Sequence, residues 1–231
     1  MTALITGGTA GVGLALARLL AADRPVTVCG RDPDRLAAAE REGLRALPAD
    51  LADPADVDRL AAAAPPGLDL LVHNAAVQLD RDWTTADPDA LVADVHRELA
   101  IDLAAPMRLT ARLLPVLATT RNPVIVTITS ALGPVPKRSA PVYCAAKAGL
   151  IAFSTSLRYQ TPVRVVDVML PLVDTAMTAG RGAGKISPDA AARAVLRALR
   201  SRRDTVRVGK AKVLIGLHRL APRLAAKVVA D

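Results

Sequence analysis

The chain has 231 residues, 52% of them apolar and only 2% aromatic, and it carries a formal net charge of +8 at neutral pH. This size suits one α/β domain with a full core. No run reaches the ~18 apolar residues that cross a bilayer, and a strand-like run beginning at Thr2 leaves no space for a signal peptide. Cys29 and Cys144 have neither metal nor disulfide spacing. We therefore expect a cytoplasmic protein with free thiols and no metal site.

Apolar runs typical of strands alternate with helical patterns along most of the chain. This alternation predicts an α/β fold, in which a parallel sheet is covered by helices on both faces. Strands are expected at residues 3–5, 26–29, 44–47, 69–72, 124–129, 163–169 and 206–208, and helices at 12–22, 34–42, 53–63, 88–99, 103–119, 141–159 and 188–200. Residues 174–186 are rich in Gly, Ala and Thr without a periodic pattern, which predicts a mobile loop.

A glycine-rich segment, Thr6 to Gly13, follows the first expected strand, and a helix begins inside it. Glycines there allow backbone amides to approach a pyrophosphate, and the helix N-terminus adds about half a positive charge. The spacing is G-x-x-x-G-x-G rather than the common dinucleotide pattern G-x-G-x-x-G. The segment predicts a nucleotide site, and a plain turn between strand and helix is the alternative.

The second expected strand ends at Cys29-Gly30-Arg31. An acidic residue at this point would bind the ribose 2′-hydroxyl and select NAD. Gly30 stands in its place, and the neighbouring Arg31 can bind a 2′-phosphate through two parallel hydrogen bonds. The sequence therefore favours NADP(H) over NAD(H), and a surface arginine without a ligand is the alternative.

Tyr143 and Lys147 are four residues apart in an expected helix, so their side chains share one face. A free tyrosine has a pKa of about 10 and exchanges protons poorly at neutral pH. An adjacent ammonium lowers the pKa of a phenol by up to about three units. The pair therefore predicts a tyrosine that acts as a general acid or base.

Together with Asn74-Ala75-Ala76 and Ser130, these motifs follow the order found in the short-chain dehydrogenase/reductase family, which residues 2 to about 176 resemble. The resemblance implies a doubly wound, Rossmann-type sheet of seven parallel strands in a three-layer sandwich. It implies an NAD(P)(H)-dependent oxidoreductase that acts on a small-molecule carbonyl or alcohol as a homodimer or homotetramer. We expect one domain over residues 1–231, with a cofactor half at about 1–120 and a catalytic half at about 121–231.

The resemblance also assigns roles. Ser130 lies at the family's interval before Tyr143, so the expected catalytic residues are Ser130, Tyr143 and Lys147. Tyr143 would exchange a proton with the substrate oxygen, Ser130 would hydrogen-bond that oxygen, and Lys147 would also bind the nicotinamide ribose. The expected cofactor-binding residues are Gly7, Thr9, Gly11, Val12, Gly13, Arg31, Asp50, Leu51, Asn74, Ala75, Tyr143, Lys147 and Thr175. Asp50 and Leu51 match the family's adenine contacts, and Thr175 matches its contact to the nicotinamide carboxamide.

Two positions depart from the family pattern. Asp102 stands where the family has an asparagine, and Leu170-Pro171 stands where a Pro-Gly pair is expected. The charge of Asp102 would act on Lys147 and return Tyr143 toward its ordinary pKa. These departures leave a second interpretation open, an NADP-binding sensor or scaffold with weak or no catalysis.

Basic residues are dense between Arg193 and Arg223, where a solvated helix face is the plain interpretation. Without a recognition motif or interleaved aromatic residues, no nucleic-acid partner is expected. Residues 213–224 have apolar side chains at near-helical spacing among basic ones. We expect them to pack on a partner subunit or over the site, and contact with an anionic membrane surface is the alternative.

Overall fold

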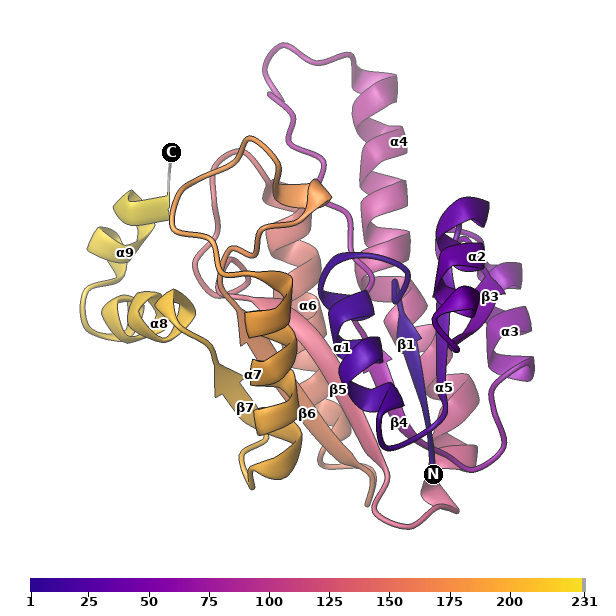
Figure 1. Ribbon diagram of the computed structural model, residues 1–231. Coiled ribbons are helices and arrows are strands. Elements are labelled where there is room, and N and C mark those ends of the chain that lie inside the picture. The colour runs from indigo at the N-terminus through magenta and orange to yellow at the C-terminus, as the bar shows by residue number, and fades with distance from the viewer. Residues whose placement is uncertain (230–231) are drawn as a thin grey trace.

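The computed structural model describes residues 1–229, which contain a seven-stranded sheet in the order β3-β2-β1-β4-β5-β6-β7 (Figure 1). All neighbouring strands run parallel. The strands are β1 (Thr2–Thr6), β2 (Val26–Gly30), β3 (Arg45–Pro48), β4 (Leu68–His73), β5 (Val124–Ser130), β6 (Arg164–Leu170) and β7 (Thr205–Arg207). The predicted doubly wound Rossmann-type sheet is therefore confirmed.

Several helices begin at a side-chain cap followed by proline. Asp32, Asp53, Asp87 and Ser187 each accept a hydrogen bond from a backbone amide of the first turn, and a proline follows each of them. This combination satisfies free amides and presets the helical backbone angle. The helices are α1 (Gly11–Ala21), α2 (Pro33–Arg41), α3 (Pro54–Ala62), α4 (Pro88–Leu99), α5 (Ala105–Ala118), α6 (Pro141–Leu157), α7 (Pro188–Arg200), α8 (Lys210–Leu220) and α9 (Pro222–Val229).

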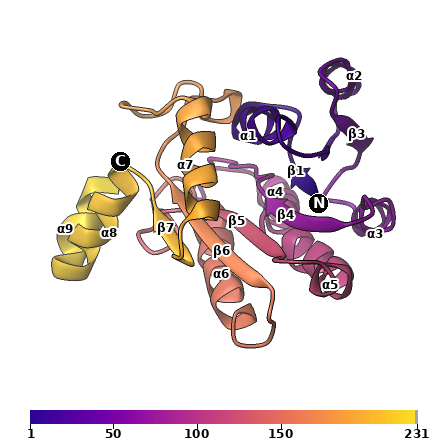
Figure 2. The same ribbon diagram turned by 60° about the horizontal axis from the view of Figure 1, so that its bottom comes forward.

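Apolar cores lie on both faces of the sheet. Leu16 of α1 and Val195 of α7 are buried in the core of one face. Leu109 of α5 and Leu157 of α6 are buried in the core of the other, to which α3 also contributes (Figure 2). Central strands are consequently apolar on both sides, and every residue of β4 is buried. The sheet is thus packed between two layers of helices.

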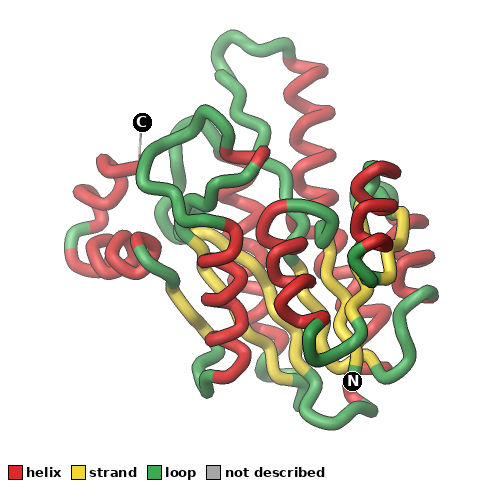
Figure 3. Tube along the Cα trace, in the orientation of Figure 1, coloured by secondary structure: helices red, strands yellow, loops and turns green. Residues whose placement is uncertain are grey.

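The ends of the predicted elements differ from the observed ones by a residue or two, and two segments differ more. Residues 100–104 form a π-helical turn that joins α4 to α5, where two separate helices were expected. Residues 174–186, expected to be a loop without pattern, contain a short 3-10 helix at Ala176–Thr178 and a bridge between Val173 and Ile186 (Figure 3). A single turn is too short to give a periodic signal in the sequence.

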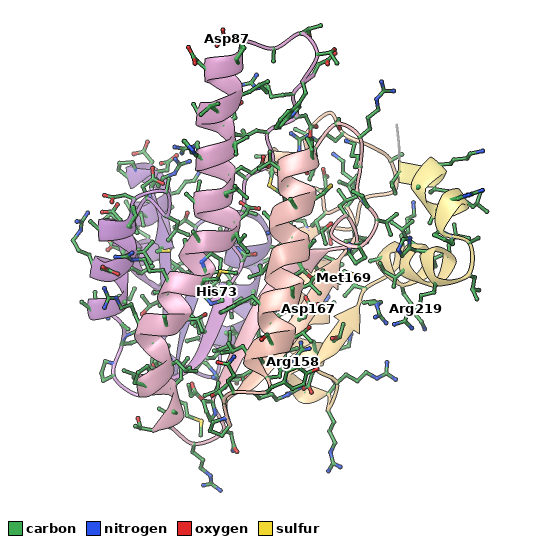
Figure 4. All side chains as sticks on the ribbon, turned by 180° about the vertical axis from the view of Figure 1, so that it is seen from behind. His73, Asp87, Arg158, Asp167, Met169 and Arg219 are labelled. Atoms are coloured by element: carbon green, nitrogen blue, oxygen red, sulfur yellow. The ribbon has the colours of Figure 1, made fainter. Side chains whose placement is uncertain are left out.

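The C-terminal segment forms α8 and α9, which lie at the β7 edge of the sheet (Figure 1). Their inner residues Ala211, Ile215 and Ala225 join a small core with Ala131 and Val135, which follow β5. Their outer face bears exposed apolar side chains, and Arg219 lies at the margin of the molecule (Figure 4). No helix within residues 1–229 is long and apolar enough to cross a membrane.

Candidate active site

The strand order reverses between β1 and β4, and the segments that follow these strands diverge there. In open parallel sheets this point leaves a crevice at the carboxyl ends of the strands. A cavity of about 520 Å³ lies at this edge. Most of the predicted cofactor residues line it, namely Gly7, Thr9, Gly11, Val12, Arg31, Asp50, Leu51, Asn74, Ala75 and Thr175. The structure therefore brings together residues from five separate segments of the chain.

Asn74 holds the glycine-rich turn in place. Its Nδ2 atom donates to the carbonyl oxygens of Thr6 at 2.9 Å and Gly7 at 3.2 Å. A Cβ atom on Gly13 would lie 2.4 Å from the Gly7 oxygen and 2.5 Å from Asn74 Nδ2, so only glycine fits there. Gly13 does not line the cavity, and its contribution is the close approach of α1 to this turn.

Thr175 lies opposite the same turn. Gly11 adopts a φ of +53°, and a Cβ added to it would lie 3.2 Å from a methyl carbon of Thr175. Thr175 precedes the 3-10 helix and borders the cavity with Met177. The segment at 174–186 therefore forms one wall of the predicted cofactor site.

Two arginines line the opposite end of the cavity, near β2. Arg31 Nη1 lies 3.4 Å from Asp50 Oδ2, and about half of the Arg31 side chain is exposed. Arg35, in the first turn of α2, lines the same cavity and pairs with Asp32 at 3.4 Å. Arg35 was not among the cofactor residues expected from the sequence, and the signal that could have found it is its place in the first turn of the helix that follows β2. Two guanidinium groups at one end of a cavity can bind a dianionic phosphate.

The expected catalytic side chains lie close together beside this cavity. Ser130 ends β5, and Tyr143 and Lys147 occupy one face of α6. Lys147 Nζ is 5.3 Å from the centre of the Tyr143 ring. The Ser130 hydroxyl acts to lower the pKa of the phenol. Tyr143 is only 7% exposed and Lys147 only 2% exposed. None of the three lines the 520 Å³ cavity itself.

Asp102 connects Lys147 to the wall of the cavity. Its Oδ2 atom is 3.2 Å from Lys147 Nζ, and its Oδ1 atom accepts a hydrogen bond of 2.8 Å from the amide of Val77. Val77 lines the cavity. The carboxylate is fully buried, so the charge of Lys147 is opposed at close range with little screening by water.

The pKa of Tyr143 departs from the sequence-based expectation. Burial raises the pKa of the phenol, the Lys147 ammonium lowers it, and the Asp102 carboxylate raises it, with a net shift upward from its ordinary value. The expectation that Lys147 gives the phenol a lowered pKa is therefore wrong for this structure, whereas the opposing effect expected of Asp102 is present. Desolvation of the phenolate outweighs the attraction of the lysine, whose charge Asp102 partly cancels.

Three loop segments, residues 78–81, 131–140 and 174–186, contact one another. Asp80, after β4, lies 3.2 Å from Arg181 Nε and 3.9 Å from Lys137 Nζ. Arg181 Nη2 also donates to the carbonyl oxygen of Gln78 at 3.0 Å. Asp80 therefore links residues 78–81, the segment before α6 and the segment at 174–186.

Leu170, part of the second departure from the family pattern, and His73 both have structural roles in the sheet. Leu170 is buried at the end of β6, paired with Ser130 of β5. His73 ends β4 (labelled in Figure 4), and its Nε2 atom is 2.8 Å from Thr110 Oγ1. Burial lowers the pKa of His73 to about 3, so the ring is neutral. Among residues 1–229, no cluster of His, Cys, Asp and Glu is suited to hold a metal ion.

Comparison with known proteins agrees with this geometry. The family model for short chain dehydrogenase matches residues 1–185. The uncharacterized oxidoreductase DltE of Bacillus subtilis (strain 168) is 38% identical over 185 residues, which are 76% of this chain and 73% of DltE. The 3-oxoacyl-(acyl-carrier-protein) reductase FabG of Escherichia coli (strain K12) is 31% identical over 186 residues, 76% of this chain and 75% of FabG.

A solved structure extends the likeness over the full length. A short chain dehydrogenase from Burkholderia cenocepacia J2315 in complex with NADP is 25% identical, with a TM-score of 0.86 over 100% of this chain and 98% of that chain. The match of the family model to most of the chain, on a Rossmann-type sheet with this motif order, shows that the chain belongs to the short-chain dehydrogenase/reductase family of NAD(P)-dependent oxidoreductases.

Proposed function

We propose that the chain is an NADP(H)-dependent oxidoreductase that interconverts a carbonyl and an alcohol, with Tyr143 as the general acid and base. The observation that supports this most directly is the convergence of Ser130, Tyr143 and Lys147 beside a cavity that two arginines line. The trio comes from a strand end and a helix, which hold reacting groups more rigidly than loops do.

The groups that line the cavity are chemically suited to the phosphates of a dinucleotide. Close backbone at Gly7 and Gly11 and the N-terminus of α1 suit a pyrophosphate, and Arg31 with Arg35 suits a 2′-phosphate. Lys147 would hold the nicotinamide ribose, and Thr175 would hold the carboxamide. NADP bound to the Burkholderia relative supports this choice of cofactor.

In the reducing direction, bound NADPH supplies a hydride to the carbonyl carbon. Tyr143 donates its phenolic proton to the carbonyl oxygen, so the product is a neutral alcohol. Ser130 donates a hydrogen bond to that oxygen and orients the carbonyl. Lys147 stabilises the resulting phenolate until a proton from water replaces the one transferred. The reverse sequence of proton steps accompanies oxidation of the alcohol.

A carbonyl substrate is consistent with the relatives, since FabG is named as a reductase of oxoacyl groups. The test is oxidation of NADPH with a panel of ketones, aldehydes and 3-oxoacyl thioesters. Turnover of at least one class, lost in Tyr143→Phe, supports the proposal. The competing function is an NADP sensor or scaffold, which the buried Asp102 motivates. Tight NADPH binding without turnover on any compound would favour that function.

A further inference from the structure

Asp102 and Lys147 form an ion pair inside the protein. Their side chains are 0% and 3% exposed, and the nearest oxygen and nitrogen atoms are 3.2 Å apart. The other carboxylate oxygen accepts the Val77 amide at 2.8 Å. One carboxylate oxygen is thus held by a hydrogen bond and the other faces the ammonium, and removing Lys147 or Asp102 would leave the remaining charge buried without compensation.

The π-helical turn places Asp102 against α6. The turn spans Ala100–Ala104 and packs on α6, which carries Lys147 and Tyr143. A π-helical turn inserts one extra residue into a helix and changes the direction in which the following side chains point. Here the result is a carboxylate directed at the amine that the proposed mechanism requires.

The pair changes what Tyr143 experiences. A lone ammonium near the phenol would stabilise the phenolate. A buried lysine and aspartate carry no net charge as a unit, whichever partner holds the shared proton. Four charged or polar groups act on the Tyr143 phenol, namely Lys147, Cys144, Ser130 and Asp102. Two further carboxyl groups, Glu98 of α4 and Asp167 of β6, interact with Lys147.

We propose that Asp102 is a positioning residue that offsets the charge of Lys147, keeps the proton on Tyr143 at neutral pH and so moves the pH dependence of alcohol oxidation toward alkaline pH. The expected effect on kinetics rests on the proposed function, whereas the effect on the ionisation of Tyr143 does not. Donation of a proton to a carbonyl requires the phenol form. Oxidation of an alcohol requires the phenolate, so it needs a more alkaline medium.

The composition of the chain allows a direct titration. It contains two tyrosines, and Tyr159 is 84% exposed, so Tyr159→Phe leaves Tyr143 as the single phenol. Phenolate absorbance in the near ultraviolet then follows Tyr143 alone, with the double variant Tyr143→Phe/Tyr159→Phe as the baseline. Asp102→Asn is introduced into the Tyr159→Phe chain, because asparagine has the same shape without the charge.

The expected result is a titration midpoint of Tyr143 at least about one pH unit lower in Asp102→Asn. Coinciding midpoints would overturn the proposal. If Asp102→Asn does not fold, the titration of the Tyr159→Phe protein alone still tests the proposal. The proposal requires Tyr143 to ionise no earlier than a free tyrosine, at about pH 10, and a midpoint below about pH 9 contradicts it.

Kinetics provide a separate readout. The pH at which kcat/KM for alcohol oxidation reaches half of its plateau should move downward in Asp102→Asn by the same amount as the phenol midpoint. A chain that turns over no carbonyl compound at all would refute the proposed function. The titration of Tyr143 would still decide the role of Asp102, so the two failures are distinguishable.

Discussion

Arg31 and Arg35 are the residues that bear on the choice between NADP and NAD. Both line the cavity, and both are about half exposed, so each can rotate toward a ligand. Their present partners are the carboxylates of Asp50 and Asp32. Exposed ion pairs of this kind are weak, about 0–1 kcal/mol, so a phosphate dianion competes with them effectively.

Arg31→Ala should weaken NADPH binding more than NADH binding, because only NADPH has the phosphate that the guanidinium would contact. We expect KM for NADPH to rise at least about tenfold, corresponding to the loss of a charge-assisted hydrogen bond of about 1.5–3 kcal/mol. Steady-state kinetics with both cofactors measure this. Arg41→Ala is the matched control, because Arg41 lies in the last turn of α2, the helix that follows Arg31, and outside the cavity. Equal losses with NADPH and NADH would contradict the assignment.

Tyr143→Phe should lower kcat about a hundredfold or more, because general acid catalysis contributes roughly that factor. The ring remains in place, so NADPH affinity should change little. Fluorescence titration of NADPH and single-turnover rates separate the two effects. Tyr159→Phe controls for the loss of a phenol elsewhere in the chain. A Tyr143→Phe enzyme with nearly normal kcat would remove the tyrosine from the mechanism.

At the scale of elements, the turn between β1 and α1 is fixed by close packing and is also the proposed phosphate site. Its backbone is fixed by Asn74, and α1 approaches it so closely at Gly13 that no side chain fits. The cradle therefore depends on contacts between β1, α1 and the residues after β4.

Gly13→Ala should abolish NADPH binding, because the new methyl group would displace the Gly7 carbonyl and the Asn74 amide. Gly216→Ala is the control, since its Cβ would meet no atom within 4 Å and its place inside α8 favours alanine. We expect Gly216→Ala to raise the free energy of unfolding by about 0.5–1 kcal/mol and to leave NADPH binding intact. Calorimetric titration and urea unfolding of both variants measure these effects. Normal binding by Gly13→Ala would refute the close approach.

A buried carboxyl group, that of Glu98, lies between α4 and the segment that follows β4. Glu98 is 1% exposed and accepts a hydrogen bond from the Leu79 amide, and burial raises its pKa to about 7. In the unfolded chain its pKa is about 4.3, so the folded form binds more protons between these values. The contribution of Glu98 to stability is therefore present below about pH 4.3 and is lost as the pH rises through about 7.

Glu98→Gln should remove this loss, since the amide keeps the acceptor oxygen without the charge. Its free energy of unfolding relative to the parent should increase between pH 5 and pH 7, by at most about 1.4 kcal/mol per pH unit. Urea unfolding across this range measures the difference, with the exposed Glu40→Gln as the control. A difference that stays constant with pH would contradict the buried carboxyl.

At the scale of the whole molecule, the structure joins one sheet to two helical layers, with α8 and α9 added at the β7 edge (Figure 2). The exposed side of this pair bears Val213, Leu220, Leu224 and Val228. The surrounding segment, residues 205–229, contains no acidic residue. Its basic residues are Arg207, Lys210, Lys212, Arg219, Arg223 and Lys227. The inner side packs on Ala131 and Val135, which follow β5.

We predict that residues 1–231 unfold as one domain and assemble as a homodimer or homotetramer. Light scattering should give two or four times the 24.0 kDa chain mass, and calorimetry should show one cooperative transition. A monomer or two separate transitions would contradict these predictions. Flotation with anionic liposomes at low salt tests the membrane alternative for α8 and α9, and recovery of the protein with the liposomes would establish it.

The sequence by itself determined the parallel sheet, the helix starts at Asp-Pro and Ser-Pro, the glycine-rich turn and the shared face of Tyr143 and Lys147. These features depend on residues close together in the chain, so periodicity and capping rules reveal them. Only the tertiary structure decided that Arg35 lines the cavity, that Asp102 lies 3.2 Å from Lys147 in a fully buried pair, and that burial raises the pKa of Tyr143. Each of these depends on how distant elements pack and exclude water, and no local pattern of residues specifies those distances.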